Sequence, residues 1–187
     1  MKFALGTSLA LYKSVEAATT LTSGYEVDFA LSGDEVTISV TMQTGSWVGL
    51  TLGDSGMSTN SDMIQIDADN ERVYDMTSAG YRSPNTDSSE NFVSTTWSTV
   101  SGGKKVDIKR KLDTNDSKDY VIPTDTYFDL GWAVNTSTST ITNKHNKKGN
   151  FRQLVSTTGA SSSTPSRASL SFGLSAVALA ATTYLLF

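Results

Sequence analysis

The sequence contains no cysteine and a single histidine, His145, and each shortage excludes a class of functional site. Without cysteine the chain cannot form a disulfide, a thiolate zinc site, an iron–sulfur cluster or a cysteine nucleophile. With one imidazole it cannot build a metal site from two or three of its own histidines. Such a domain must be stabilised by burying an apolar core, and 187 residues are enough for that.

Positive charge is also scarce. The chain carries 15 Lys and Arg against 19 Asp and Glu, a formal net charge of −4. Because nucleic-acid binding needs a positive field, we expect no nucleic-acid partner. The basic residues gather in two islands, Lys104–Lys111 and Lys144–Arg152. We interpret the first as a solvated face or the guard of an edge strand, whereas the second surrounds His145.

Helical periodicity is missing between the two ends of the chain, and short alternating segments take its place. Val36, Ile38 and Val40, for example, alternate with Thr and Ser. The segments are 25–31, 35–42, 46–52, 63–67, 72–76, 91–100, 105–112, 127–134 and 150–155. Turn signals rich in Gly, Asp and Asn separate them. About nine short strands at this spacing predict an antiparallel all-β sandwich or barrel.

Both ends of the chain resemble targeting signals that flank a domain of residues 18–155. Residues 1–17 predict a secretory signal peptide, with a short amphipathic strand or helix as the alternative. Residues 156–168 form a Ser/Thr-rich spacer and 169–187 an apolar tail, which together predict a GPI-attachment signal. We place the lipid among residues 159–163, at Ser161. A single-pass anchor and a buried C-terminal helix are the rival interpretations.

Met57 and His145 both lie in segments that we predict to be loops. A thioether and an imidazole form one of the standard axial pairs for haem iron in electron-transfer cytochromes. The sequence has no CxxCH motif, so a haem held by this pair would be a non-covalent haem b. On the residues alone, two ordinary loop residues remain the competing interpretation. Candidate pocket walls are Trp47, Tyr81, Trp97, Trp132 and Phe128, and candidate propionate partners are Lys144, Lys147, Lys148 and Arg152.

The segment from Ser46 to Ser89 resembles the DOMON domain family. The matching features, in order, are Trp47-Val48-Gly49-Leu50, Gly56-Met57, Asp62, Met63–Ile66, Val73–Asp75 and Gly80-Tyr81 with Pro84. Phe128–Val134 and Lys144–Gly149 are similar to the last third of such domains. The resemblance covers about residues 25–155. It implies an antiparallel immunoglobulin-like β-sandwich of about nine to eleven short strands.

The cytochrome-type members of this family hold haem b between a Met of the first loop and a His of the last. The resemblance therefore implies Met57 and His145 as axial ligands, with Trp47, Tyr81 and Lys144 as further haem-contacting residues. It implies a one-electron carrier rather than an enzyme, with a redox partner on a separate molecule. The two end signals place this carrier on the outer face of the plasma membrane. Met63 is the substitute ligand to consider, although strand alternation favours the core for Met63. We also expect Met42 and Met76 in the core.

Two functions of other classes stay open: a haem-free module that binds carbohydrate or another small ligand, and a structural or adhesive surface protein. Two sequons predict glycosylation at Asn115 and Asn135. We expect Asp62 to cap a turn or hold a loop, and Asp119 to be a solvated loop charge.

Overall fold

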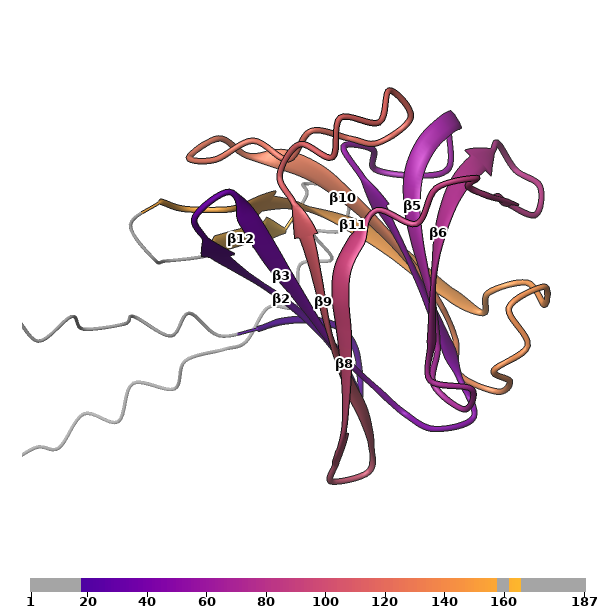
Figure 1. The fold of residues 1–187 in the computed structure, drawn as a ribbon. Coiled ribbons are helices and arrows are strands. Elements are labelled where there is room, and N and C mark those ends of the chain that lie inside the picture. Colours follow the sequence, from indigo (N-terminus) through magenta and orange to yellow (C-terminus); the bar gives the residue numbers. More distant parts are fainter. Residues whose placement is uncertain (1–17, 158–161, 166–187) are drawn as a thin grey trace, which may run out of the picture.

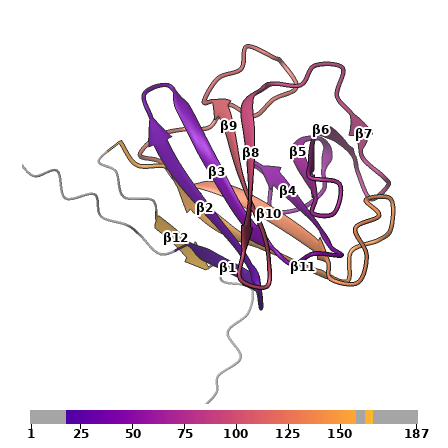
Figure 2. The same cartoon turned by 60° about the horizontal axis from the view of Figure 1, so that its bottom comes forward.

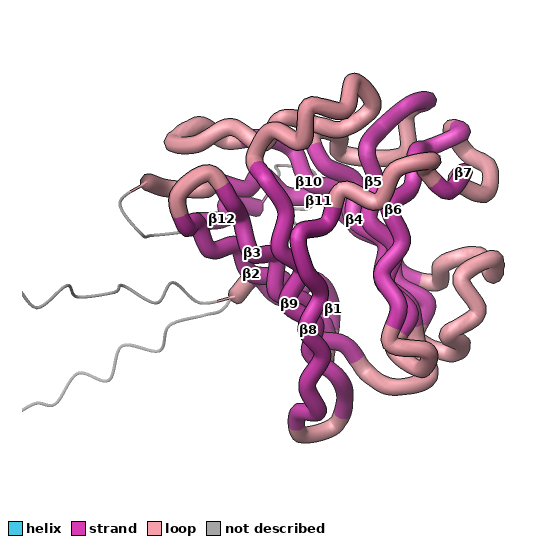
Figure 3. Tube along the Cα trace, in the orientation of Figure 1, coloured by secondary structure: helices cyan, strands magenta, loops and turns pink. Residues whose placement is uncertain are grey.

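The computed structural model describes residues 18–157 and 162–165, and all regular structure in this part of the chain is β-strand (Figures 1 and 3). The strands are β1 (Thr19–Thr22), β2 (Tyr25–Ser32), β3 (Glu35–Met42), β4 (Trp47–Leu52), β5 (Thr59–Asp67), β6 (Arg72–Ala79), β7 (Asn85–Thr86), β8 (Phe92–Val100), β9 (Gly103–Lys111), β10 (Phe128–Asn135), β11 (Lys147–Leu154) and β12 (Ser162–Pro165). The predicted signal peptide, Ser161 and the apolar tail lie outside the described residues. Among the residues that are described, no helical segment could cross a bilayer.

Two antiparallel sheets form a sandwich, in the strand orders β1-β2-β3-β9-β8 and β12-β11-β10-β4-β5-β6-β7 (Figure 2). The predicted β-sandwich is confirmed, and each of the nine predicted segments coincides with a strand. The sequence pattern missed β1, β7 and β12, which are edge strands of four, two and four residues. Strand β9, which carries the first basic island, lies between β3 and β8, so its interpretation as the guard of an edge strand is wrong.

The apolar core lies between the two sheets. Val36, Ile38 and Val40 of β3 belong to one buried cluster with alternate residues of β4, β5 and β10. Phe29 of the five-stranded sheet meets Phe128 of the seven-stranded sheet edge-to-face, with ring centroids 6.1 Å apart. Burial of apolar surface at about 25 cal/mol per Å² is the main free energy that stabilises such a sandwich.

The outer face of the seven-stranded sheet is buried as well. All of β4 is buried, and so is β5 from Asp62 to Asp67. Because Ile64 and Ile66 belong to the core cluster, alternation places Met63 on the outer face, where it pairs in register with Met76. Neither methionine belongs to the core cluster. The expectation that Met63 and Met76 point into the core is therefore wrong, and both are buried outside it.

Candidate functional site

Met57 and His145 lie in two loops at opposite ends of the same pair of strands. Met57 lies in the 53–58 loop, which follows Leu52 at the end of β4. His145 lies in the 136–146 loop, which follows Asn135 at the end of β10. Because β4 and β10 are antiparallel, with Leu52 opposite Leu130 and Trp47 opposite Asn135, these two loops leave the sheet in opposite directions. The two side chains can meet only if the loops fold back over the sheet.

The 136–146 loop does fold back over the outer face. Gln65, an outer-face residue of β5, donates from Nε2 to the carbonyl oxygen of Ile141 at 2.9 Å. In Figure 1 this loop (orange, lower right) lies beside β5 and β6, on the side away from β8 and β9. Its base is closed by two hydrogen bonds, from Asn146 N to Val134 O at 3.0 Å and from Asn135 Nδ2 to Lys144 O at 2.8 Å. These bonds fix the backbone on both sides of His145.

The 53–58 loop is folded around the carboxylate of Asp54. This carboxylate accepts hydrogen bonds from Gly56 N and Ser58 N at 3.1 Å each, and from Ser61 Oγ at 2.6 Å. Burial raises the pKa of Asp54, but the hydrogen bonds from Ser58, Ser61 and Gly56 outweigh it and leave the pKa below its usual value. The loop packs against Gly131 of β10, where an added Cβ would lie 3.1 Å from both Asp54 O and Gly56 N. The 53–58 loop therefore also packs against the outer face.

The two loops thus approach each other from opposite ends. Gly131 contacts the Met57 loop and is in register with Thr51 of β4. Gln65 contacts the His145 loop and is in register with Gly49 of β4. Thr51 and Gly49 are two residues apart, which is roughly 7 Å along the strand. Gly131 and Gln65 are also two strands apart, which adds roughly 10 Å across the sheet. The structure brings the two loops onto one patch of the outer face, and a Met57–His145 contact stays a prediction.

His145 is half-buried in the 136–146 loop. Burial lowers the pKa of His145 below its usual value, and the nearby charges of Lys148 and Lys144 lower it further. At neutral pH the ring is therefore uncharged and carries a free nitrogen lone pair, which is the form that binds a metal. The lysine-rich island around His145 thus acts on its protonation state.

The sheet surface beneath the two loops carries the apolar side chains of Trp47, Met63 and Met76 beside the polar Thr51 and Gln65, and it contains an orphaned donor. Trp47 is 5% exposed, and its ring lies over Gly49, where an added Cβ would be 3.4 Å from it. The Trp47 Nε1–H is buried without a hydrogen-bond partner among the described residues. Met63 and Met76 continue the same face on β5 and β6. The residues present therefore fit a haem. They offer a soft thioether, a neutral imidazole, apolar side chains and one unpaired N–H.

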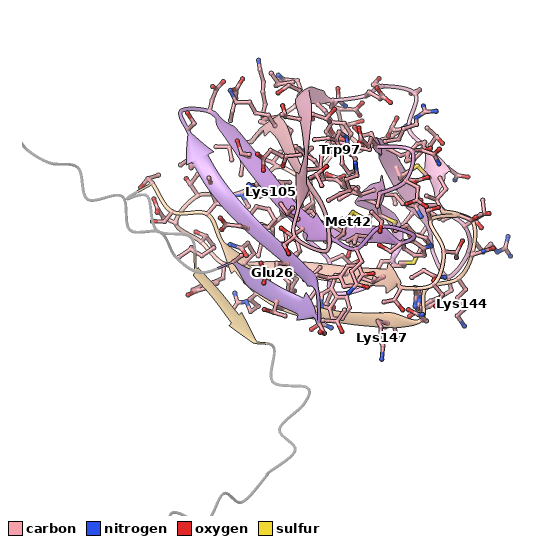
Figure 4. All side chains as sticks on the ribbon, turned by 90° about the horizontal axis from the view of Figure 1, so that it is seen from below. Glu26, Met42, Trp97, Lys105, Lys144 and Lys147 are labelled. Atoms are coloured by element: carbon pink, nitrogen blue, oxygen red, sulfur yellow. The ribbon has the colours of Figure 1, made fainter. Side chains whose placement is uncertain are left out.

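The other predicted haem contacts lie in different places. Tyr81 follows β6 and is 97% exposed, and the side chain of Lys144 lies at the periphery of the molecule (Figure 4). Phe128 belongs to the core cluster, and Trp97 lies on β8 in the other sheet, so neither can line the outer face. Trp132 packs against the core. Of the predicted aromatic walls, Trp47 is the one buried on the outer face.

Gly131→Ala tests the coupling between the outer face and the Met57 loop. The new Cβ would overlap Thr51 Oγ1 and press on Asp54 O and Gly56 N, so the loop must shift. We expect a loss of about 1–3 kcal/mol in the free energy of unfolding, as for other overpacked sites. Urea denaturation measures it. Gly56→Ala in the same loop is the control, because an added Cβ there meets nothing within 4 Å. Equal stability of the two variants would contradict the packing described here.

Sequence reasoning missed a buried charge cluster where the first half of β5, the middle of β6 and the end of β9 meet the 112–127 segment (Figure 1). Arg110, with a side chain 1% exposed, donates from Nη1 to Asp62 Oδ2 at 3.0 Å. Its Nη2 lies 3.5 Å from Asp119 Oδ2, and one oxygen each of Asp62, Asp75 and Asp119 lie within 4.8 Å of one another. Asp62 does more than cap a turn, and the prediction of a solvated Asp119 is wrong because its side chain is 3% exposed. An arginine on an inward-facing position of β9 was the signal available in the sequence.

Asp75 gives this cluster a pH dependence. Burial raises the pKa of Asp75 to about 6, and the neighbouring carboxylates of Asp119 and Asp62 contribute to the rise. A carboxyl whose pKa is higher in the folded than in the unfolded state stabilises the fold at low pH, and that stabilisation is lost as pH rises from about 4 through about 6. At about 1.4 kcal/mol per pKa unit, the protonated Asp75 carboxyl contributes at most about 3 kcal/mol to the free energy of unfolding.

We therefore expect the stability difference between the wild type and Asp75→Asn to move in favour of the variant as pH rises through this window. Urea denaturation between about pH 4 and pH 7 measures it, with a chelator present so that no metal ion competes for the carboxylates. A stability difference between the two proteins that does not change with pH would contradict the raised pKa of Asp75.

Comparisons with known proteins agree with this architecture. The family model described as "DOMON domain" matches residues 21–135, which run from β1 to the end of β10. The chain belongs to the DOMON domain family. Met57 lies inside the matched part of this DOMON domain, and His145 lies ten residues beyond it.

Two solved structures are similar to this DOMON domain in fold. The cytochrome b domain of pyranose dehydrogenase from Coprinopsis cinerea is 18% identical, with a TM-score of 0.51 over 68% of this chain and 74% of that chain. The cytochrome domain of Myriococcum thermophilum cellobiose dehydrogenase is 18% identical, with a TM-score of 0.50 over 73% of this chain and 76% of that chain. No curated protein matches the sequence. At this sequence identity the two structures support the fold only. The ligand must be inferred from the residues of the site.

Proposed function

We propose that this DOMON domain binds one haem b on the outer face of its seven-stranded sheet and transfers single electrons. The observation that carries the proposal is a buried outer face that the Met57 loop and the His145 loop both contact, with a Trp47 N–H that has no partner among the described residues. Met57 and His145 would be the axial ligands. When bound, haem would supply an iron that exchanges one electron, and a filled Met–His pair favours electron transfer over oxygen chemistry.

The protein's own residues would hold and shield this site. The depressed pKa of His145 keeps its ring neutral, and the hydrogen bonds of Asn135 and Asn146 hold the backbone on either side of it. The Asp54 carboxylate orders the Met57 loop through the amides of Gly56 and Ser58. Trp47, Met63 and Met76 would exclude water, which raises the reduction potential of a buried iron.

The cellular setting is also a proposal. A signal peptide and a GPI attachment at Ser161 would place the domain on the outer face of the plasma membrane, where its redox partner would be a separate oxidoreductase. Asn115 is exposed, whereas Asn135 is 7% exposed and its Nδ2 donates to Lys144 O. Because this nitrogen is nearly buried and bonded within the 136–146 loop, we expect glycosylation at Asn115 and not at Asn135. Enzymatic deglycosylation of the Asn115→Gln and Asn135→Gln variants, followed by mass measurement, distinguishes the two sites.

Titration of the haem-free protein with haemin tests the proposal. We expect binding at a ratio of one to one and a six-coordinate low-spin spectrum. Met57→Ala should change the spectrum, and Ser55→Ala in the same loop should leave it intact. Ser55 is exposed and serves as the matched control. Absence of saturable binding would overturn the proposal.

A second candidate function is the binding of a small polar ligand such as a sugar. A polar hollow of about 380 Å³ opens beside the Met57 loop, and Asp54, Asn60, Lys118 and Tyr120 contribute to its lining. Glycan binding by the haem-free protein that Asn60→Ala abolishes would favour this alternative.

A further inference from the structure

We propose that Asp62, Asp75 and Asp119 form a buried site for one calcium ion, at a distance from the candidate haem-binding face. One oxygen of each carboxylate lies within 4.8 Å of the others. Calcium binds carboxylate oxygens at about 2.3–2.6 Å and tolerates irregular geometry, so one ion can bridge oxygens at these separations. The site involves neither Met57 nor His145.

The charge of the cluster does not balance without a cation. Three carboxylates carry −3 and the guanidinium of Arg110 carries +1, which leaves −2 when all are ionised. The nearby cation Lys118 pairs with Asp87 at 3.2 Å and its side chain is 52% exposed, so it serves another carboxylate. An uncompensated buried charge costs several kcal/mol. A divalent cation would bring the cluster to neutrality, whereas one proton would leave it at −1.

The hydrogen bonds leave one oxygen free on each carboxylate. Asp62 Oδ2 accepts from Tyr120 N at 2.8 Å and from Arg110, and Asp75 Oδ2 accepts from Asn91 N at 3.0 Å. Asp119 Oδ2 accepts from Thr114 Oγ1 at 2.7 Å and from Asn91 Nδ2 at 3.0 Å. The donors among the described residues thus converge on the Oδ2 atoms. Of the three Oδ1 atoms, that of Asp62 is the one that is buried without a hydrogen-bond partner among the described residues.

Asp62 Oδ1 is a second, independent sign of a missing ligand. This atom is buried and has no hydrogen-bond partner among the described residues, in a side chain that is 1% exposed. Buried carboxylate oxygens are normally paired, and each exception needs an explanation such as an ion or a water.

A calcium ion here would tie together parts of the chain that are far apart in sequence. Asp62 begins the buried part of β5, Asp75 lies on β6 and Asp119 lies in the 112–127 segment. Asp62 comes one residue after Ser61, which donates to Asp54 in the Met57 loop. Bound calcium would therefore also order the loop that carries Met57.

Calorimetric titration of the chelator-treated protein with CaCl₂, together with the thermal midpoint Tm with and without calcium, tests this site. We expect binding at one ion per chain, a saturable rise in Tm, and a weaker response to MgCl₂, which demands a smaller and more regular shell. Asp75→Asn keeps the shape and removes one ligand charge, and it should weaken calcium binding roughly tenfold or more. Asp129→Asn is the control, because Asp129 is half-exposed and lies on β10.

Each other outcome counts against the site. Absence of calcium binding by the wild type overturns it, and so does binding that Asp75→Asn leaves unchanged. Stabilisation on acidification without any response to calcium would assign the cluster to a shared proton instead, and would also overturn it. All readouts are made without haem, so they are independent of the proposed electron transfer.

Discussion

We expect the His145→Ala variant to lose tight haem binding. The ring is the one imidazole of the chain, its pKa is depressed so that it is neutral, and its loop is fixed at its base by Asn135 and Asn146. Removal of a partner that only supports a metal ligand typically costs roughly 10–100-fold in affinity, so we expect loss of the ligand itself to cost at least about 100-fold. Haemin titration followed by absorption spectroscopy measures the change.

Two controls separate loss of ligation from loss of folding. Thr142→Ala changes an exposed residue of the same loop and should leave the affinity unchanged. Added imidazole should restore a six-coordinate spectrum to His145→Ala, because a free imidazole can take the place of the missing ring. Wild-type affinity in His145→Ala without imidazole would exclude His145 as a ligand.

Arg110→Met strongly destabilises the fold. It leaves Asp62 and Asp119 buried without their guanidinium, and loss of one partner of a buried pair typically costs about 3–5 kcal/mol. Lys109→Met is the matched control on the next residue, because the Lys109–Glu35 pair is partly exposed and such pairs contribute about 1 kcal/mol or less. Urea denaturation in the presence of a chelator compares the two variants. Equal losses would show that the buried pair contributes no more than a surface pair.

Strand alternation in the sequence was enough to predict the sandwich. Val36, Ile38 and Val40 on one side of a segment predict a strand with one buried face, and all nine segments of this kind are strands. The same rule failed on β5 and β6, because it assigns one buried face to a strand. The 136–146 loop and the 53–58 loop overlie the second face, so Met63 is buried on the outer face and not in the core where we predicted it.

The candidate site was only partly predictable for a related reason. Met57 and His145 could be singled out as residue types, but which loops fold over the sheet depends on hydrogen bonds such as Gln65 to Ile141. The buried charge cluster was missed because charged residues are rarely buried unless paired. The hydrogen-bond partners of Asp62 lie 48 and 58 residues away in sequence, at Arg110 and Tyr120, and no local pattern joins them.

The most direct test of the central claim is the axial ligation of iron in the haem-loaded protein. Near-infrared magnetic circular dichroism of the ferric form reports the chemical type of both axial ligands. We predict a low-spin species with one thioether and one imidazole ligand, replaced in Met57→Ala by a species without the thioether and with a lower reduction potential. A low-spin species with two nitrogen ligands, or a thioether signal that survives in Met57→Ala, would contradict the assignment of Met57 and His145.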